Sequence, residues 1–274
     1  MLLTALQLQS CLSQNLSALA LPWEVEVFDR IDSTSSELMR QAKLRALAPK
    51  VLVSLEQTHG RGRGGNAWFS NQNDSLTFSI GLPLKPLSWL GLSLCVGIDL
   101  AHSLDPDQGL DLKLKWPNDV WVYKADRFHK LAGILIETIN PNPDSPFSTS
   151  QARYCVIGVG VNFNTPDLQT HSLQISPMGL SDLGSGLSRQ ELITQMVSKL
   201  TTTLKLFERE GFLGFKTKFD QLDCLKGREI HLSDGTTGQC LGVNHQGELL
   251  VLQNGDIRTI VSMDVSVRPR NPLQ

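Results

Sequence analysis

The sequence predicts an α+β protein in which a large domain, built on a mixed sheet with flanking helices, is followed by a small all-β domain. Three observations support this fold class. Strand-like and helix-like patterns alternate over residues 1–224, short strands separated by tight turns fill residues 225–274, and 41% of the 274 residues are apolar. A chain of this length and composition can bury one large hydrophobic core and a small second one. We therefore expect two domains, 1–224 and 225–274.

The strands of the first domain are expected where short runs are apolar or alternate in polarity. Residues 24–28 alternate polar and apolar side chains, as a half-buried strand does. Further strands are expected at residues 51–55, 76–82, 112–115, 120–123, 131–138 and 154–161. Residues 140–150 are rich in Pro, Ser and Asn, which predicts an exposed loop.

Two helix starts are predicted from capping boxes. Thr34 and Glu37 have the capping-box spacing, so a helix should begin there and run to about residue 47. Ser188 and Glu191 repeat the spacing ahead of a long amphipathic helix, and Gly211 stands where that helix should stop.

Two more helices are predicted from composition. Residues 1–20, rich in Leu, Gln and Ser, predict a short peripheral helix, and the apolar run over residues 86–103 predicts a buried one. A DNA-binding helix-turn-helix module would need roughly 60 residues ahead of the main domain. The first strand of that domain is expected at residues 24–28, which leaves no room for such a module, so we expect no specific DNA binding.

The second domain is predicted to be a small β-barrel. Its expected strands are residues 229–232, 238–243, 249–252, 257–260 and 264–268. Asp234-Gly235, Gln246-Gly247 and Asn254-Gly255 separate them and are typical of tight turns.

Composition narrows the class of protein. The net charge of −2 provides no global basic field for nucleic acid. The five cysteines are scattered and form no Cys-x-x-Cys pair, so we expect reduced thiols and a cytoplasmic location rather than disulfides or a zinc site. The sequence has no signal peptide pattern and no run of about 20 apolar residues that could span a membrane.

The segment Gly60-Arg-Gly-Arg-Gly-Gly65 formally matches the dinucleotide-binding fingerprint. That interpretation requires a helix to begin inside the motif and an acidic residue about 20 positions later, and neither follows here. Glycines interleaved with Arg61 and Arg63 instead indicate a mobile loop that folds over a carboxylate or phosphate and excludes water. The alternative is a solvated basic turn, and a tryptophan such as Trp68, taken alone, is more often a core residue than a platform for a ligand.

Two lysines follow at strand ends. Lys115-Trp-Pro-Asn-Asp119 predicts a proline turn, at which Lys115 can neutralise a phosphate while Asn118 and Asp119 can order a Mg²⁺ hydration shell. Lys130 begins an apolar strand, where a partly buried ammonium is costly without an anion, and Gly133 lets a ligand approach the backbone. The alternatives are an ordinary β-turn and a snorkelling lysine at a strand end.

Three further features allow more than one interpretation. Asp32-Ser33-Thr34-Ser35 is an ordinary helix cap or, compatibly, a small polar or anion site at a helix N-terminus. Gly158-Val-Gly-Val-Asn162 is a glycine-weakened strand or a surface against which a flat ring lies. Glu137 is either the charge partner of Lys130 or a surface residue.

Taken together, and in their order along the chain, the motifs resemble those of the biotin–protein ligases over roughly residues 25–270. The shared blocks are Ser33-Thr34, Gln57, Gly60-Arg-Gly-Arg-Gly-Gly65 with Trp68, Lys115-Trp-Pro-Asn-Asp119, Lys130-Leu-Ala-Gly-Ile-Leu-Ile-Glu137 and Gly158-Val-Gly-Val-Asn162. The resemblance is to the monofunctional type without a DNA-binding domain. It implies a class II aminoacyl-tRNA synthetase-like catalytic domain followed by an SH3-like barrel. It also implies a reaction in which biotin and MgATP give biotinyl-5′-AMP, whose biotin passes to a lysine of the biotin carboxyl carrier protein of acetyl-CoA carboxylase.

The resemblance also implies roles for individual residues, in a cytoplasmic monomer or homodimer that uses ATP and Mg²⁺. Lys130, Arg61 and Arg63 would be catalytic, because cations must bring two anionic substrates together. Biotin would contact Ser33, Thr34, Ser35, Gln57, Gly60, Arg61, Gly62, Arg63, Trp68, Lys130 and Gly133. ATP would contact Lys115, Asn118, Asp119, Lys130 and Asn162, with Asp119 also a Mg²⁺ ligand.

The loop departs from the family pattern at two positions. Gly64 and Asn66 stand where the family often has arginine, so we expect weaker retention of the adenylate. Two other functions are alternatives to a biotin–protein ligase. A lipoate–protein ligase would share the catalytic fold, but the Gly/Arg loop and Lys-Trp-Pro-Asn-Asp favour biotin. A non-catalytic biotin-sensing regulator is disfavoured by the net charge of −2 and by the intact Lys130, Arg61 and Arg63.

Overall fold

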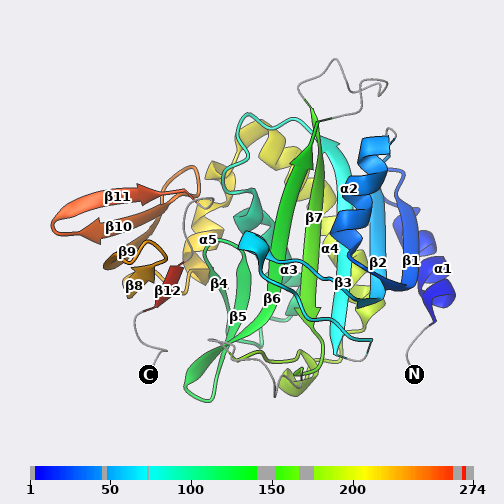
Figure 1. The fold of residues 1–274 in the computed structure, drawn as a ribbon, viewed down its shortest axis with the longest axis horizontal. Helices are drawn as coiled ribbons and strands as arrows, with labels where there is room; N and C mark the ends of the chain where they lie inside the picture. The colour runs from blue at the N-terminus through cyan, green and yellow to red at the C-terminus, as the bar shows by residue number, and fades with distance from the viewer. Residues whose placement is uncertain are drawn as a thin grey trace.

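A seven-stranded mixed sheet forms the centre of the molecule (Figure 1). The computed structural model describes residues 4–44, 48–72, 74–140, 152–166, 176–261 and 267–269. The strands are β1 (Glu24–Ile31), β2 (Lys50–Gln57), β3 (Ser75–Leu84), β4 (Leu112–Lys115), β5 (Asp119–Lys124), β6 (Arg127–Ile139) and β7 (Arg153–Asn162). Their order is β1-β2-β3-β7-β6-β5-β4, with β1 and β2 parallel and the other neighbours antiparallel. All seven predicted strands are confirmed, although most are longer than predicted.

Helices cover both faces of this sheet (Figure 1). The helix α2 (Thr34–Leu44) lies on one face, and α3 (Leu92–Leu104) and α4 (Arg189–Glu210) lie on the other. Alternation along β2 separates the two layers, because Val51 and Val53 belong to the main core whereas Leu52 packs in the smaller cluster under α2. The helix α1 (Ala5–Leu16) contacts β1 and α4, and α5 (Lys216–Leu222) contacts α3.

The helix boundaries confirm one capping box and correct the other. Ser188 caps α4 with its reciprocal partner Glu191, and α4 ends immediately before Gly211. At α2, however, the Ser33 hydroxyl accepts from the Ser36 backbone N–H, so Ser33 rather than Thr34 is the cap. The side chain of Thr34 is therefore available for other hydrogen bonds. The predicted end of this helix near residue 47 lies outside the described residues.

Three other helix predictions need correction. The buried helix α3 begins at Leu92, not residue 86, because Gly91 adopts a left-handed conformation with φ of 79° that interrupts the helical path. The N-terminal helix is less peripheral than predicted, since Leu8, Leu12 and Leu16 are buried. The short helix α5 was not predicted. The proline-rich segment 140–150 lies almost wholly outside the described residues.

The C-terminal strands form a five-stranded antiparallel sheet of order β11-β10-β9-β8-β12. They are β8 (Glu229–Leu232), β9 (Thr237–Val243), β10 (Leu249–Gln253), β11 (Asp256–Ile260) and β12 (Val267–Pro269). The predicted turns are confirmed, with positive φ at Gly235, Gly247, Asn254 and Gly255. In the described ranges β11 and β12 are not paired, so closure into an SH3-like barrel stays a prediction, as does the boundary at 224/225.

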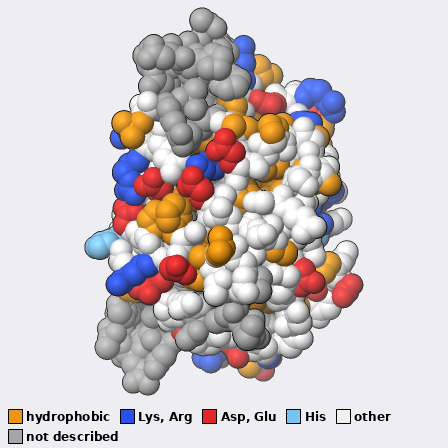
Figure 2. Space-filling view, turned by 90° about the vertical axis from the view of Figure 1, so that its right-hand side faces the viewer, with side chains coloured by type: hydrophobic (Ala, Val, Ile, Leu, Met, Phe, Trp, Pro, Cys, Tyr) orange, Lys and Arg blue, Asp and Glu red, His pale blue; other side chains and the backbone are white. Residues whose placement is uncertain are grey.

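Acidic and basic side chains are mixed on the surface. On the face shown in Figure 2, acidic and basic side chains lie beside one another among scattered hydrophobic groups. The exposed Arg30–Glu56 pair, at 3.0 Å, is an example of such mixed charges. Within the ranges that the structure describes, no helix combines the length and apolar character needed to cross a bilayer.

A buried carboxyl between α3 and α4 makes stability depend on pH. Burial raises the pKa of Asp99 to about 6, against an ordinary value of 3.8. Since the folded state then holds the proton more tightly than the unfolded state, stability falls as the pH rises from about 4 to about 6.

We predict that Asp99→Asn raises the free energy of unfolding by about 1–3 kcal/mol at pH 8, because the amide need not ionise. Urea denaturation should show this gain shrinking to near zero below pH 4. The exposed control Asp107→Asn should change stability by less than about 0.5 kcal/mol at either pH. A gain from Asp99→Asn that is equal at pH 4 and pH 8 would contradict the ionisation argument.

Candidate active site

A cavity of about 410 Å³ opens on the sheet face that carries α2. Most of the predicted site residues line it, namely Ser33, Thr34, Ser35, Gln57, Arg61, Gly62, Arg63, Trp68, Lys115, Asn118, Asp119, Lys130 and Gly133. Gly60 and Asn162 do not line it. The cavity has two chemically different ends, one rich in hydroxyl and amide groups and one rich in cations.

The first end is a network of buried hydroxyl and amide groups. Thr34 Oγ1 and Ser35 Oγ lie 2.7 and 2.9 Å from Ser79 Oγ, and the Thr34 backbone N–H donates to Gln57 Oε1 at 2.7 Å. A Cβ at Gly158 would lie 2.4 Å from Ser35 Oγ, so only glycine leaves room for these hydroxyls. The network fixes the orientation of groups that can bind a neutral polar ligand.

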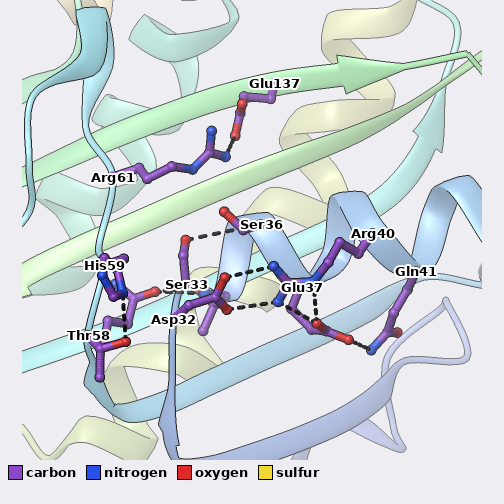
Figure 3. Close-up of polar contacts among 12 residues, drawn as sticks. Asp32, Ser33, Ser36, Glu37, Arg40, Gln41, Thr58, His59, Arg61 and Glu137 are labelled. Carbon is purple, nitrogen blue, oxygen red and sulfur yellow. Dashed lines mark hydrogen bonds and ion pairs between the residues drawn. The ribbon is translucent and has the colours of Figure 1, made fainter.

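Asp32 and Arg40 brace this end from outside (Figure 3). Arg40 donates to both carboxylate oxygens of Asp32 at 2.7 and 2.8 Å, and it also contacts Glu37. The hydrogen bond from Arg40 holds the pKa of Asp32 at about 2. The bidentate contact joins the residue before the Ser33 cap to the second turn of α2.

The second end concentrates positive charge around one carboxylate. Lys130 Nζ lies 2.8 Å from Asp119 Oδ1. Burial lowers the pKa of Lys115, the charges of Lys130 and Arg63 lower it further, and Asp119 opposes them. Burial likewise lowers the pKa of Arg63, again opposed by Asp119. Three cations facing one carboxylate leave a surplus of positive charge, which is stabilised by an anionic ligand.

A bay built from two glycines holds the indole of Trp68. Gly133 and Gly160 are paired across β6 and β7, and a Cβ at Gly160 would lie 2.4 Å from Trp68 Cε2. Lys130 Nζ lies 5.6 Å from the centre of the Trp68 ring. The flat ring expected against the glycine strand is thus Trp68 of the chain itself.

Two asparagines act on the backbone. Asn118 Nδ2 donates to the Ile134 carbonyl at 2.7 Å, and Asn162 Nδ2 donates to the Lys130 carbonyl at 3.0 Å. Asn162 therefore holds the backbone of β6 at Lys130, where the part of this strand that lines the cavity begins.

The Gly/Arg loop is a small hairpin. The Trp68 N–H donates to the Gly60 carbonyl at 2.9 Å, and the Gly62 N–H donates to the Asn66 carbonyl at 2.7 Å. Gly64 has φ of 62°, a left-handed conformation in which an arginine would be strained. This conformation gives a physical reason for the glycine that departs from the family pattern. Arg61 pairs with Glu137, which is accordingly not the partner of Lys130.

Sequence reasoning missed several cavity residues. Thr77 and Ser233 line the cavity, and the fully buried Ser79 carries the hydroxyl network. Ser75, Thr77 and Ser79 place hydroxyls at every second position of an otherwise apolar strand, a signal that could have been read as one polar face. Ser233 follows β8 in the second sheet, and no local pattern connects it to the site.

The described residues hold no cluster of three or more His, Cys, Asp or Glu side chains suited to a metal ion. Magnesium is often bound through one or two carboxylates together with substrate phosphates. A single carboxylate such as that of Asp119 is enough for this mode of binding, because phosphates of the substrate supply further ligands.

Comparison with known proteins assigns the family. A family model described as Biotin/lipoate A/B protein ligase family matches residues 27–162. The Bifunctional ligase/repressor BirA of Salmonella typhimurium is 33% identical over 250 residues, covering 89% of this chain and 74% of that protein. The Biotin--[acetyl-CoA-carboxylase] ligase of Mycobacterium tuberculosis is 32% identical over 146 residues, 51% of this chain and 49% of that protein. The Aquifex aeolicus biotin protein ligase structure in complex with biotin and ATP superposes with a TM-score of 0.72 at 27% identity, covering 90% and 99% of the two chains. This chain belongs to the biotin/lipoate A/B protein ligase family.

We predict that Gly160→Ala displaces the Trp68 indole, because the added methyl group would overlap the ring. Acrylamide quenching of Trp68 fluorescence should increase. The contribution of Trp68 is obtained by subtracting the fluorescence of the matching protein that carries Trp68→Phe. The control Gly186→Ala places its methyl group in open space and should leave quenching unchanged. Unaltered quenching in Gly160→Ala would show that the bay does not hold the ring in solution.

Proposed function

We propose that this protein is a biotin–protein ligase that activates biotin with MgATP to biotinyl-5′-AMP and transfers the biotin to a lysine of a biotin carboxyl carrier protein. The observation that carries the proposal is the pairing, in one cavity, of a hydroxyl–amide end with a cation cluster. Biotin has the same two parts, a neutral ureido ring and a carboxylate. The named activities of the relatives support the same function.

In the first step the biotin carboxylate oxygen attacks the α-phosphorus of ATP, and pyrophosphate leaves. We assign the ureido ring to Ser33, Thr34 and Gln57, and the carboxylate to Lys130, which exchanges Asp119 for the substrate. Both reactants are anionic, so Lys130 and its neighbouring cations reduce their repulsion and stabilise the charge at phosphorus.

The nucleotide half of the cavity belongs to the turn between β4 and β5. Lys115 would meet the phosphates, and Asp119 would face Mg²⁺ when the ion arrives with ATP; the bound ion neutralises phosphate charge. In the second step the neutral amine of the acceptor lysine attacks the acyl carbon, the bond from that carbon to the phosphate oxygen breaks, and AMP leaves. Neither step requires a nucleophilic side chain of this protein.

The buried hydroxyl network favours biotin over lipoate. The ureido ring can pair with Ser33, Thr34 and Gln57, whereas the dithiolane ring of lipoate offers no comparable hydrogen-bonding groups. Polar groups left unpaired in a closed site discriminate strongly between ligands. Four further expectations stay predictions: a monomer or homodimer, an acceptor that belongs to acetyl-CoA carboxylase, the lack of specific DNA binding, and a cytoplasmic location.

We predict biotin-dependent pyrophosphate release from ATP, with lipoate at least about 100-fold poorer, a lower bound because buried polar groups left unpaired can reduce turnover by about 10⁴-fold or more. Lys130→Ala should reduce adenylate formation by about 100-fold or more, as expected for loss of an electrostatic contact in the transition state. Lys205→Ala, an exposed lysine on α4, is the control and should keep wild-type turnover. Lipoate turnover equal to that of biotin would refute the preference for biotin, and near-normal turnover of Lys130→Ala would refute the role assigned to Lys130.

We predict that Asn66→Arg reduces leakage of biotinyl-AMP into solution, because a cation is restored to the loop. The measurement is free biotinyl-AMP released in the absence of acceptor. Since the substitution also removes the 2.8 Å hydrogen bond from Asn66 Nδ2 to the Arg63 carbonyl, Asn66→Ala is the matched control and should leak at least as much as wild type. Equal leakage from all three proteins would remove the idea.

A further inference from the structure

The two arginines of the Gly/Arg loop point to different partners. Arg61 reaches from the loop to the carboxylate of Glu137 on β6 (Figure 3). Arg63 lies within electrostatic reach of Asp119, in the cation cluster. Both arginines line the cavity, and within it Arg63 is near Asp119 whereas Arg61 is paired with Glu137 on β6.

The Arg61–Glu137 pair spans the cavity. The loop follows β2, and in the sheet order β2-β3-β7-β6 the strands β3 and β7 separate β2 from β6. Thr77 on β3 and Gly158 on β7 line the cavity between them. Glu137 is two residues beyond Leu135 and four beyond Gly133, so it lies on the same face of β6 as these two lining residues.

The hydrogen bonds inside the loop set its shape but not its position. The Trp68–Gly60, Gly62–Asn66 and Asn66–Arg63 bonds all join loop residues to one another. Contacts from the hairpin to the sheet include the Trp68 ring in its glycine bay and the Arg61–Glu137 pair, and both start from the base of the hairpin, where Arg61 bridges Ala67. A hairpin held by the Trp68 ring alone can pivot about that ring, whereas a second contact, from the long Arg61 side chain to Glu137 on β6, restricts the pivot.

We propose that Arg61 and Glu137 form a strap that holds the loop across the cavity, with Glu137 a positioning residue for the ligase reaction and Arg63 the arginine that faces the substrate. This inference rests on the proposed function and changes the role expected for Arg61. In it, Arg61 acts through the position of the loop. Both side chains are partly exposed, at 41% and 26%, so the strap is weak enough to open for substrate entry and product release.

The first test needs no substrate. Hydrogen–deuterium exchange of loop amides 61–67 in the ligand-free protein should be about two- to fivefold faster in Glu137→Gln, the effect of losing a partly exposed ion pair. The control is Glu56→Gln, which removes the Arg30–Glu56 pair between β1 and β2, strands already joined by backbone hydrogen bonds at that register. The control should leave loop exchange unchanged. The charge swap R61E/E137R should restore the wild-type rate.

The second test asks whether the strap serves the reaction. Glu137→Gln should raise the KM for biotin and the release of free biotinyl-AMP by about two- to fivefold, while kcat for biotin-dependent pyrophosphate exchange changes less than about twofold. R61E/E137R should recover retention of the intermediate, whereas Arg63→Ala should lower kcat.

The outcomes separate the two proposals. Unchanged loop exchange in Glu137→Gln, or faster exchange that the swap fails to restore, overturns the strap. Faster exchange with unaltered release of biotinyl-AMP overturns its role in the reaction. A wild-type protein that forms no biotinyl-AMP at all refutes the proposed function, and the exchange measurement still decides whether the strap exists.

Discussion

The charge imbalance around Asp119 is the constraint on which the rest of the site depends. Lys115 and Asp119 are cross-strand neighbours in β4 and β5, and Asp119 in turn pairs with Gly133 of β6. Antiparallel pairing of three consecutive strands thus brings the two lysines of the sequence to one carboxylate. A one-residue slip would move these side chains to the opposite face of the sheet, so the register of β4, β5 and β6 is itself part of the chemistry. The surplus cations are costly in an empty protein and favourable once anions bind.

The turn that carries this chemistry is held from several sides. Trp116, 1% exposed, donates from its indole to the carbonyl of Gly247, in the turn between β9 and β10, at 3.0 Å. Ser93 at the start of α3 donates to the Pro117 carbonyl at 2.8 Å. Cys224 donates its backbone N–H to the Leu114 carbonyl at 3.1 Å. The residues between Lys115 and Asp119 therefore have structural roles that leave the two terminal charges directed toward the cavity, and the second sheet contributes Ser233 to the same cavity.

Glycine determines what can lie on the floor of the cavity. Gly158 leaves room for the hydroxyls at the head of α2, and Gly160 leaves room for the indole of Trp68. The same strand thus serves a polar end and an aromatic wall without presenting any side chain of its own there. The loop lies beside this floor, with Arg61 paired to Glu137 and Arg63 near Asp119.

The sequence by itself determined the strands, the capping of α4, the tight turns of the second sheet and most residues that line the cavity. These features are local, because strand periodicity, cap spacing and turn glycines act within a few residues. Only the tertiary structure decided which charges pair, since Lys130 takes Asp119 rather than Glu137, and Glu137 takes Arg61. It also decided that Ser33 caps α2, that Gly91 delays α3, and that Ser79 and Ser233 belong to the site. Strand order and packing set these contacts, and no pattern along the chain encodes the distance between residues that are far apart in sequence.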